Sequence, residues 1–391
     1  MKVLVCNVGS TSLKFKLYEM PECRVLAKSG VERVGSDKDA IFRYENCLNG
    51  EKISFDQADI PDYASGIRLF LDYLTGTKTG VIPAVDAIER IGFKTTLSKG
   101  HLGIHELDQE VLQGMQDWIS LAPLHNRAYL EAIDVMREFL PASRFIGCFE
   151  TAFHQTIPLS RKLFGVPYEW YEKYQVQRLG YHGASHGYIA DVLNEKGRDY
   201  TAISCHLGGS CSICAIENGK SVDTSFGMSL ESGLIHAARV GDMDTSMSYF
   251  LHDEGLSDTE ILTGLQKKGG LLGISGISSD LRYILEAAEA GNQRAQLAVD
   301  VFVTGIVHYI GAFAMDLGRL DYLVFTAGIG EHSDYIRQAV CARLGILGVK
   351  LDEEKNHQGE TLISSKDSLV QVLVIPTDEE LGIARRTYEM P

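Results

Sequence analysis

One local pattern occurs twice, about half the chain apart, and it constrains the fold more than any other feature of the sequence. An apolar run at residues 2–8 (KVLVCNV) leads into the turn GSTS at 9–12 and then into the alternating strand LKFKLYE. Residues 201–207 (TAISCHL) lead in the same way into GGSCS at 208–212 and the strand ICAIE, which ends at the hairpin turn Asn-Gly. A strand–turn–strand unit that recurs once predicts an internal duplication with two similar domains, and not a solenoid.

Helical and strand patterns fill the rest of the chain in alternation. The periodicity predicts amphipathic helices at residues 65–76, 107–119, 126–140, 185–195, 257–268, 278–290 and 293–318. Two more strands, YLVFTAGIG at 322–330 and VLVIPTDEE at 372–380, end in polar turns. Strands that alternate with helices predict an α/β fold with a largely parallel sheet in each domain. Because no long Pro/Ser linker separates the halves, we expect the domains to abut around a cleft.

Length and charge narrow the class of protein. The 391 residues are enough for two domains with substantial cores. With 37 Lys and Arg against 52 Asp and Glu, the formal charge is −15, which argues against nucleic acid or an anionic membrane surface as the main partner. A few arginines can still form a positive pocket for a small anion in an acidic protein.

The cysteines and the apolar segments indicate a cytoplasmic protein. The eight cysteines are scattered, and Cys6 and Cys205 lie inside apolar runs, which is typical of reduced thiols in a protein core. The N-terminal apolar run breaks at Asn7, so it lacks the apolar region of a signal peptide. The segment 297–317 carries two aspartates and a histidine, which favours a buried helix over a membrane span.

Three glycine-containing turns are candidates for binding phosphate or nucleotide. The first, at residues 7–14, offers backbone N–H groups, hydroxyls and Lys14, although a plain hairpin turn is an equal interpretation. The second is preceded by His206, which either donates to a phosphoryl oxygen or is a buried strand histidine. The third, at residues 326–331, follows a strand and opens a helix, as nucleotide sites do. It is neither a Walker A motif nor a full GxGxxG motif, and a close strand–helix crossing is the alternative.

Charged side chains at predicted strand and helix ends add further candidates. Arg90 and Arg239 either make bidentate contact with a carboxylate or phosphate, or form surface salt bridges. His182 at a helix start suits an anion, and Glu150 after a strand suits a base or a metal shell. The acidic run 378–380 is a candidate Mg²⁺ ligand cluster or a helix cap. Together with the glycine turns, these residues favour phosphoryl transfer, in which positioning and charge neutralisation do most of the catalysis.

The series of motifs resembles that of the acetate kinase family, which includes acetate and propionate kinases. The similar segments are, in the family's order from end to end, NVGSTSLKFKLYE, LAPLHN, FETAFH, GYHGASH, ISCHLGGSCSI, SGLIHAARVGDMD, GGLLGISGISSDLR, VFTAGIGEHS and IPTDEELGIAR. The resemblance implies duplicated ribonuclease H-like domains of the actin/Hsp70/sugar-kinase superfamily, the first at 1–148 plus 379–391 and the nucleotide-binding second at 149–378. It also implies reversible ATP-dependent phosphorylation of acetate or a similar short carboxylate, Mg²⁺ or Mn²⁺ as cofactor, and a homodimer.

Carried over position by position, the resemblance implies a set of site residues. The catalytic residues would be Arg90, Glu150, His182 and Arg239, with the two arginines on the substrate carboxylate and the transferring phosphoryl group. The phosphate and nucleotide would contact Ser10, Ser12, Lys14, His206, Gly208, Gly209, Asp280, Leu281, Arg282, Gly328, Ile329 and Gly330. The acyl pocket would consist of Gly92, Leu124, Tyr181 and Leu230, and the metal would be held by Asn7 and Glu379.

The sequence departs from the family's pattern where the chemistry is expected. The family's HRVVHGG is ERIGFKT at residues 89–95, so that Gly92 replaces a valine and Lys94 a glycine. The family's aspartate in FDTAFH is Glu150, and the asparagine and glycine of HLGNG are replaced at 209–210. We expect Gly92 to open space in the acyl pocket, and Lys94 either to add a cation near the cleft or to point to solvent. Two alternatives therefore stay open: a kinase for a different carboxylate, and a nucleotide-binding paralogue with little kinase activity.

Overall fold

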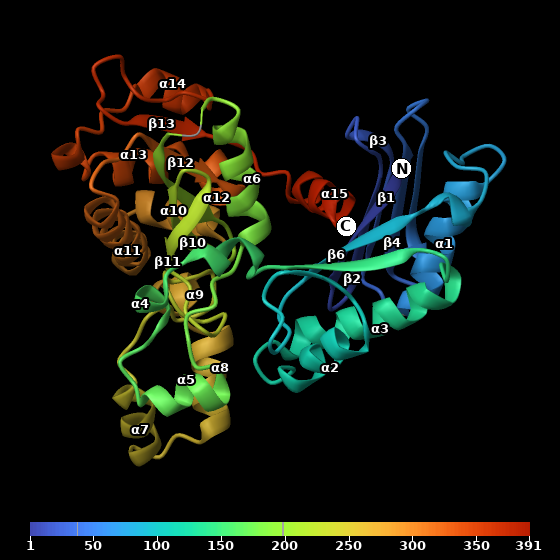
Figure 1. Cartoon of the computed structure of the whole chain (residues 1–391). Coiled ribbons are helices and arrows are strands. Elements are labelled where there is room, and N and C mark those ends of the chain that lie inside the picture. The colour runs from blue at the N-terminus through green and yellow to red at the C-terminus, as the bar shows by residue number, and fades with distance from the viewer. Residues whose placement is uncertain (37, 198) are drawn as a thin grey trace. The chain divides into compact units, whose positions relative to one another are not determined.

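The chain folds into two compact units, and each is described by itself. A computed structural model describes residues 1–36, 38–197 and 199–391. Unit 1 comprises Met1–Ala152 together with Asp378–Pro391, and unit 2 comprises Phe153–Thr377 (Figure 1). The domain boundaries after residues 148 and 378 stay a prediction about the functional domains.

Unit 1 is built on an eight-stranded mixed sheet with the strand order β5-β4-β3-β2-β1-β6-β8-β7. Strands β1 to β5 form an antiparallel meander, β6 runs parallel to β1 and to β8, and β7 is antiparallel to β8. The strands are β1 (Lys2–Gly9), β2 (Ser12–Glu19), β3 (Arg24–Glu32), β4 (Ala40–Asn46), β5 (Lys52–Ala58), β6 (Arg90–Thr95), β7 (Ile104–Glu106) and β8 (Arg144–Phe149).

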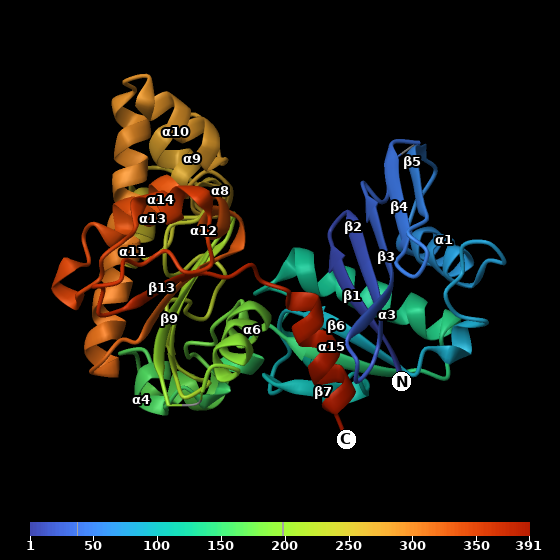
Figure 2. The same ribbon diagram turned by 90° about the horizontal axis from the view of Figure 1, so that it is seen from above.

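Helices pack on both faces of the unit 1 sheet. Helices α1 and α3 bury one face in a core that includes Leu13, Phe70 and Ile133. Helix α15, from the C-terminal end of the chain, packs on β1, β6 and β8 from the opposite face, as Figure 2 shows. The helices are α1 (Tyr63–Thr75), α2 (Gln109–Asp117), α3 (Pro123–Phe139) and α15 (Glu379–Glu389). Aspartate side chains cap the N-termini of α1, α2 and α15, which fixes where these helices begin.

Unit 2 repeats this arrangement in a five-stranded sheet with the order β11-β10-β9-β12-β13. Strands β9, β10 and β11 are antiparallel, whereas β12 is parallel to β9 and to β13. The order and directions match those of β3-β2-β1-β6-β8 in unit 1, so residues 2–18 and 201–217 hold equivalent positions. The predicted duplication is confirmed. The strands are β9 (Thr201–Leu207), β10 (Cys211–Glu217), β11 (Lys220–Thr224), β12 (Tyr322–Thr326) and β13 (Gln371–Val374).

The unit 2 sheet is also covered on both faces. Helix α6 packs on one face in a core with Ile189 and Val324, and α11 packs on the other in a larger core. The helices are α4 (Leu159–Lys162), α5 (Tyr168–Tyr174), α6 (Gly183–Asn194), α7 (Ser246–Asp253), α8 (Asp258–Lys267), α9 (Gly270–Ser275), α10 (Leu281–Glu289), α11 (Gln293–Leu317), α12 (Ala327–His332), α13 (Asp334–Cys341) and α14 (Glu353–Gln358).

Helix α11 is long and apolar enough, by length and composition, to cross a membrane. Its buried residues recur every three or four positions, as at Phe302, Ile306, Ile310 and Phe313, and α11 packs against β9 and β10. One buried face against a sheet is the pattern of an amphipathic core helix.

The expectation of largely parallel sheets is wrong. Short turns, such as the one after β1 and the Asn-Gly turn after β10, can only join antiparallel strands. The extension of the first sheet through β3, β4 and β5 was not assigned from the sequence at all.

Candidate active site

In unit 1, β6 presents three residues to α15 on one face. Side chains alternate along a strand, so Arg90, Gly92 and Lys94 share the face opposite to that of the core residues Ile91 and Phe93. The Arg90 guanidinium donates to three carbonyls at the C-terminal end of α15, two of them at 3.0 Å. Arg90 and Lys94 are four residues apart, which separates them by about 13 Å along the strand. Arg90 thus pairs with the C-terminal end of α15, at the other end of β6 from Lys94, and the carboxylate-binding role expected for it stays a prediction.

The missing side chain at Gly92 allows α15 to approach β6 closely. A Cβ atom there would lie 2.2 Å from Oγ1 of Thr387 and 3.0 Å from Cγ2 of Ile383. The space left by the missing valine is therefore filled by the helix. Gly92 therefore opens no space on the face of β6 that packs on α15. The expectation that it widens an acyl pocket there is wrong.

Lys94 lies between two carboxylates at the carboxyl ends of β6 and β8. Its Nζ is 2.6 Å from Oε2 of Glu379 and 3.2 Å from Oε1 of Glu150. The side chains of Lys94, Glu379 and Glu150 are only 22%, 17% and 9% exposed. Burial alone would lower the pKa of Lys94, but the two carboxylates outweigh it and hold that pKa well above its usual range. Lys94 therefore carries its charge into the cluster and does not point to solvent.

Tyr129 of α3 holds Asn7 at the end of β1. Its hydroxyl donates to Oδ1 of Asn7 at 3.2 Å and accepts the N–H of Val8 at 3.3 Å. Burial raises the pKa of Tyr129, so the phenol stays protonated and can donate.

The phosphate-binding residues predicted for unit 1 lie on the β1–β2 hairpin. Lys14 is the register partner of Asn7, and Ser12 is that of Gly9. Ser10 and Lys14 are exposed, and Ser12 is half-buried. The structure therefore brings these predicted residues together on one hairpin.

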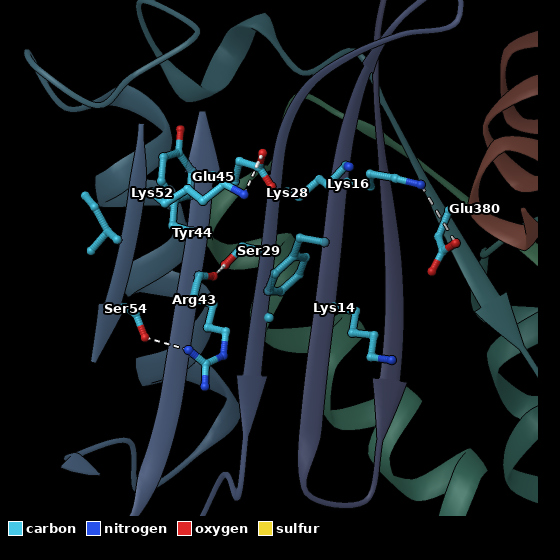
Figure 3. A pocket seen from close by; sticks show the side chains of 13 residues that line it. Lys14, Lys16, Lys28, Ser29, Arg43, Tyr44, Glu45, Lys52, Ser54 and Glu380 are labelled. Carbon is cyan, nitrogen blue, oxygen red and sulfur yellow. Dashed lines mark hydrogen bonds and ion pairs between the residues drawn. The ribbon is translucent and has the colours of Figure 1, made fainter. Parts of the chain in front are cut away.

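Strands β2 to β5 of the unit 1 sheet line a basic groove of about 450 Å³. Figure 3 shows its lysines and its arginine, and Lys16 reaching Glu380. The Nζ of Lys16 is 3.3 Å from Asp378 and 4.0 Å from Glu380. The acidic run at the start of α15 is thus divided between two lysines, Lys16 for its outer residues and Lys94 for Glu379.

The residues predicted to hold a metal do not fit a protein-bound divalent cation. Glu379 is ion-paired with Lys94, and Oδ1 of Asn7 accepts from Tyr129. Within residues 1–36, 38–197 and 199–391, no group of three His, Cys, Asp or Glu side chains is placed to hold a metal ion. Mg²⁺ needs oxygen ligands at about 2.0–2.1 Å, and an ammonium group between the carboxylates would repel it. With Lys94 and Tyr129 in these positions, Asn7 and Glu379 do not fit a divalent cation bound by the protein, and the metal role expected for them stays a prediction.

In unit 2, two stacked histidines lie at the carboxyl end of β9. The rings of His182 and His206 have centroids 3.9 Å apart and planes 24° apart. Nδ1 of His182 is 2.8 Å from Oγ of Ser212, and Nδ1 of His206 is 2.9 Å from Oγ of Ser185. His182 also adopts a left-handed backbone conformation with φ of 56° at the start of α6. Such strained residues cluster at functional sites.

Three more buried histidines lie in unit 2, of which His186 is next to this pair, and all three are neutral at pH 7. Burial holds the pKa of His186 well below its usual range, and Nε2 of its ring is 2.8 Å from Ser212. Burial also lowers the pKa of His154 to about 4 and that of His236 to about 3. These three rings therefore position their neighbours without adding charge.

Arg239 lies in a loop that folds against the second glycine turn. The N–H of Ala237 donates to the carbonyl of Gly209 at 3.0 Å, and the Arg239 guanidinium donates to the carbonyl of Leu230 at 2.6 Å. Burial lowers the pKa of Arg239, although Glu231 opposes the shift. Arg239 is thus a partly desolvated cation beside the turn.

The two predicted acyl-pocket residues of unit 2 differ in their surroundings. Tyr181 is 1% exposed, donates its hydroxyl to a main-chain carbonyl, and meets Phe226 edge-on at 5.1 Å. Leu230 adjoins Arg239 through its carbonyl. Leu124 lies outside the residues whose side chains the structure describes.

The third glycine turn joins β12 to α12, as predicted. Thr326, the last residue of β12, is the register partner of His206, so this turn and the second turn lie at the same end of the sheet. A Cβ atom on Gly328 would meet nothing within 4 Å, whereas one on Gly330 would lie 3.3 Å from the Phe325 backbone. A side chain at Gly330 would therefore crowd the strand–helix packing, whereas Gly328 leaves an open approach to the turn.

The remaining nucleotide residues lie at the start of α10. Asp280 caps that helix and pairs with the guanidinium of Arg282 at 2.6 Å. Leu281 belongs to the same core that Ile329 packs against.

Among the six residues that follow His206, Gly209 lies beside the loop that carries Arg239, and Ser212 lies beside the histidines. Ser212 faces His206 across the β9–β10 pairing. Sequence reasoning missed this serine, and also Ser185 and Tyr129. The hairpin register of the repeat contained the signal for Ser212, whereas Ser185 and Tyr129 approach from helices.

Both units have ribonuclease H-like topology, and unit 2 carries glycine turns, stacked histidines and a partly desolvated arginine, groups that suit phosphoryl transfer. The chain belongs to the acetokinase family, whose model matches residues 2–385.

Its relatives and structural neighbours match over their full lengths. The acetate kinase of Clostridium novyi is 41% identical over 398 residues, covering 100% of this chain and 98% of its own. That of Shouchella clausii is 43% identical over 401 residues, covering 100% and 99%. The crystal structure of the Porphyromonas gingivalis acetate kinase has a TM-score of 0.88 at 38% identity, covering 99% and 98%. A Francisella tularensis propionate kinase has a TM-score of 0.90 at 32% identity, covering 100% of both chains. Membership of this family makes the chain an ATP-dependent phosphotransferase with a carboxyl group as acceptor.

Proposed function

We propose that this protein is an acetate kinase that transfers the γ-phosphoryl group of ATP to acetate, reversibly and by direct in-line transfer. The observation that carries the proposal is the family match over essentially the whole chain, together with curated acetate kinases 41% and 43% identical to it. Unit 2 supports this proposal, because cationic and polar groups of that unit lie at the carboxyl end of β9.

The proposed roles follow from charge and position. Arg239 stabilises the charge that spreads over the transferring phosphoryl oxygens, since its burial strengthens electrostatic interactions. His182 and His206, held by serines, donate to the same oxygens. Gly328–Gly330 and Asp280–Arg282 receive the nucleotide. Glu150 is ion-paired with Lys94 and contributes a negative charge at the carboxyl ends of β6 and β8 in unit 1.

We further propose that Mg²⁺ or Mn²⁺ enters as the complex with ATP, and that the protein is a cytoplasmic homodimer. The functional domains are those proposed from the sequence, 1–148 plus 379–391 and 149–378. These proposals rest on the family.

A different short carboxylate is the second candidate, because a propionate kinase is among the structural neighbours. The hydroxyl of Tyr181 already donates to a main-chain carbonyl, so its proton is not available to an acyl group. The third candidate is a nucleotide-binding paralogue with little kinase activity.

Hydroxylamine trapping separates the three candidates. Purified protein with MgATP is given acetate, propionate or butyrate, and acyl hydroxamate is quantified beside calorimetric ATP binding. We expect the highest kcat/KM with acetate. Preference for a longer acid would establish the second candidate, and ATP binding without hydroxamate from any acid would establish the third.

A further inference from the structure

Lys94 occupies the space between two carboxylates that come from different elements of unit 1. Glu150 follows β8 and Glu379 opens α15, and both reach the same ammonium, at 3.2 Å and 2.6 Å. Two largely buried carboxylates that share one site repel each other unless a cation lies between them. In this chain the cation is a covalent part of β6.

The neighbouring acidic and polar side chains already have partners of their own. Lys16 pairs with Asp378 and Glu380 on either side of Glu379, and Tyr129 donates to Asn7. Within the described residues, no cluster of three potential metal ligands remains. The family pattern quoted above has glycine where Lys94 stands, so the ammonium is a feature of this chain and not of the motif it resembles.

We propose that the Lys94 ammonium is a built-in cation that replaces a protein-bound divalent cation between Glu150 and Glu379. The free protein then binds no divalent metal at these carboxylates, and any divalent metal used in the reaction arrives with the nucleotide. An ammonium and a divalent cation that both lie within about 3 Å of the same carboxylate oxygens repel each other strongly in a partly buried site, so the bound ammonium disfavours the metal. The inference refines the proposed reaction, but its test uses neither nucleotide nor carboxylate substrate.

The test is a titration of nucleotide-free protein with Mn²⁺, in which free Mn²⁺ is followed by electron paramagnetic resonance. Lys94→Gly removes the side chain, and Lys94→Gln keeps most of its volume without the charge. We expect each variant to gain one Mn²⁺ site at least tenfold tighter than any site of the wild type. Adding Glu379→Gln to either variant should abolish the gain.

Lys16→Gln is the matched control, because it removes a lysine from the same acidic run while leaving Glu150 and Glu379 paired with Lys94. It should bind Mn²⁺ as the wild type does. A variant of Lys94 that is unstable alone should be restored by Mn²⁺, seen as a rise in melting temperature that the wild type lacks. The proposal is overturned if the wild type already holds Mn²⁺ in a Glu379-dependent site. It is equally overturned if the Lys94 variants bind Mn²⁺ no more tightly than Lys16→Gln. Because no turnover is measured, failure of this proposal and failure of the kinase assignment are separate results.

Discussion

The guanidinium of Arg90 donates to three carbonyls at the C-terminal end of α15, where main-chain carbonyls have no partner within the helix. Helix C-termini favour cations, and hydrogen bonds from a charged donor are worth about 1.5–3 kcal/mol each when a partner is lost. The pairing explains why an arginine stands at the start of β6 without invoking a substrate.

Arg90→Ala should therefore lower the free energy of unfolding by about 1–3 kcal/mol while leaving kcat/KM for the carboxylate within about threefold. Urea denaturation and steady-state kinetics measure the two quantities. A loss of activity of about 100-fold with unchanged stability would instead support the carboxylate-binding role expected from the sequence.

His154 makes unit 2 sensitive to acid. Its Nε2 donates to the carbonyl of Tyr181 at 2.8 Å, its Nδ1 lies 2.9 Å from Ser221, and burial lowers its pKa to about 4. The unfolded chain, with an ordinary histidine pKa near 6.5, takes up the proton more readily than the folded chain. This contribution to stability is complete above about pH 6.5 and is lost as the pH falls towards 4.

At pH 5, the loss attributable to His154 should be about 2 kcal/mol relative to pH 7. Denaturation of the wild type and of His154→Gln at both pH values isolates it, since the variant should show a shallower pH dependence. An equal pH dependence in both proteins would show that His154 is not responsible.

At the scale of elements, α15 and β6 are fitted to each other along their length. Arg90 meets the end of the helix, Gly92 its middle, and Lys94 its beginning. Two departures from the resembled motif, Gly92 and Lys94, thus have the same structural context as the retained Arg90.

Gly92→Val tests this fit, because the added Cβ would lie 2.2 Å from Thr387. Overpacking of this kind costs about 1–3 kcal/mol, and Thr387→Ala in the same chain should recover part of it. A double-mutant cycle on unfolding free energies gives the coupling. Additive effects would mean that the helix does not pack on Gly92 in solution.

The third glycine turn gives a cleaner probe of nucleotide binding than a change at the packed Gly330. Gly328→Phe fills open space, so it should weaken ATP binding at least tenfold without lowering the melting temperature. Calorimetry with MgATP measures the affinity. Unchanged affinity in a folded variant would place the nucleotide elsewhere.

At the scale of the whole molecule, the features that depend on short stretches of sequence could be predicted. The duplicated hairpin, the strand-to-helix turn after β12 and the core helix α11 follow from periodicity and turn residues, and the motifs gave the family. Positions that depend on packing were not predictable. Arg90 and Gly92 were assigned by motif, but their neighbours belong to α15, almost 300 residues later in the chain. The position of Lys94 between Glu150 and Glu379 depends on the same distant helix.

The same distinction holds for unit 2. His182, His206 and Arg239 were identified as candidates from their motifs, and the structure gathers them at one sheet end. The serines that orient the rings come from a neighbouring strand and a helix, whose pairing with these histidines no single segment reveals.

Phosphoryl transfer to acetate that depends on Arg239 can be measured by ³¹P NMR of purified protein with MgATP and acetate. We expect the acetyl phosphate and ADP signals to rise together in the wild type. Arg239→Ala, with its fold and ATP affinity preserved, should form acetyl phosphate on the order of 100-fold or more slowly. The proposed transfer is contradicted if the wild type forms no acetyl phosphate while binding MgATP, or if Arg239→Ala forms it at the wild-type rate.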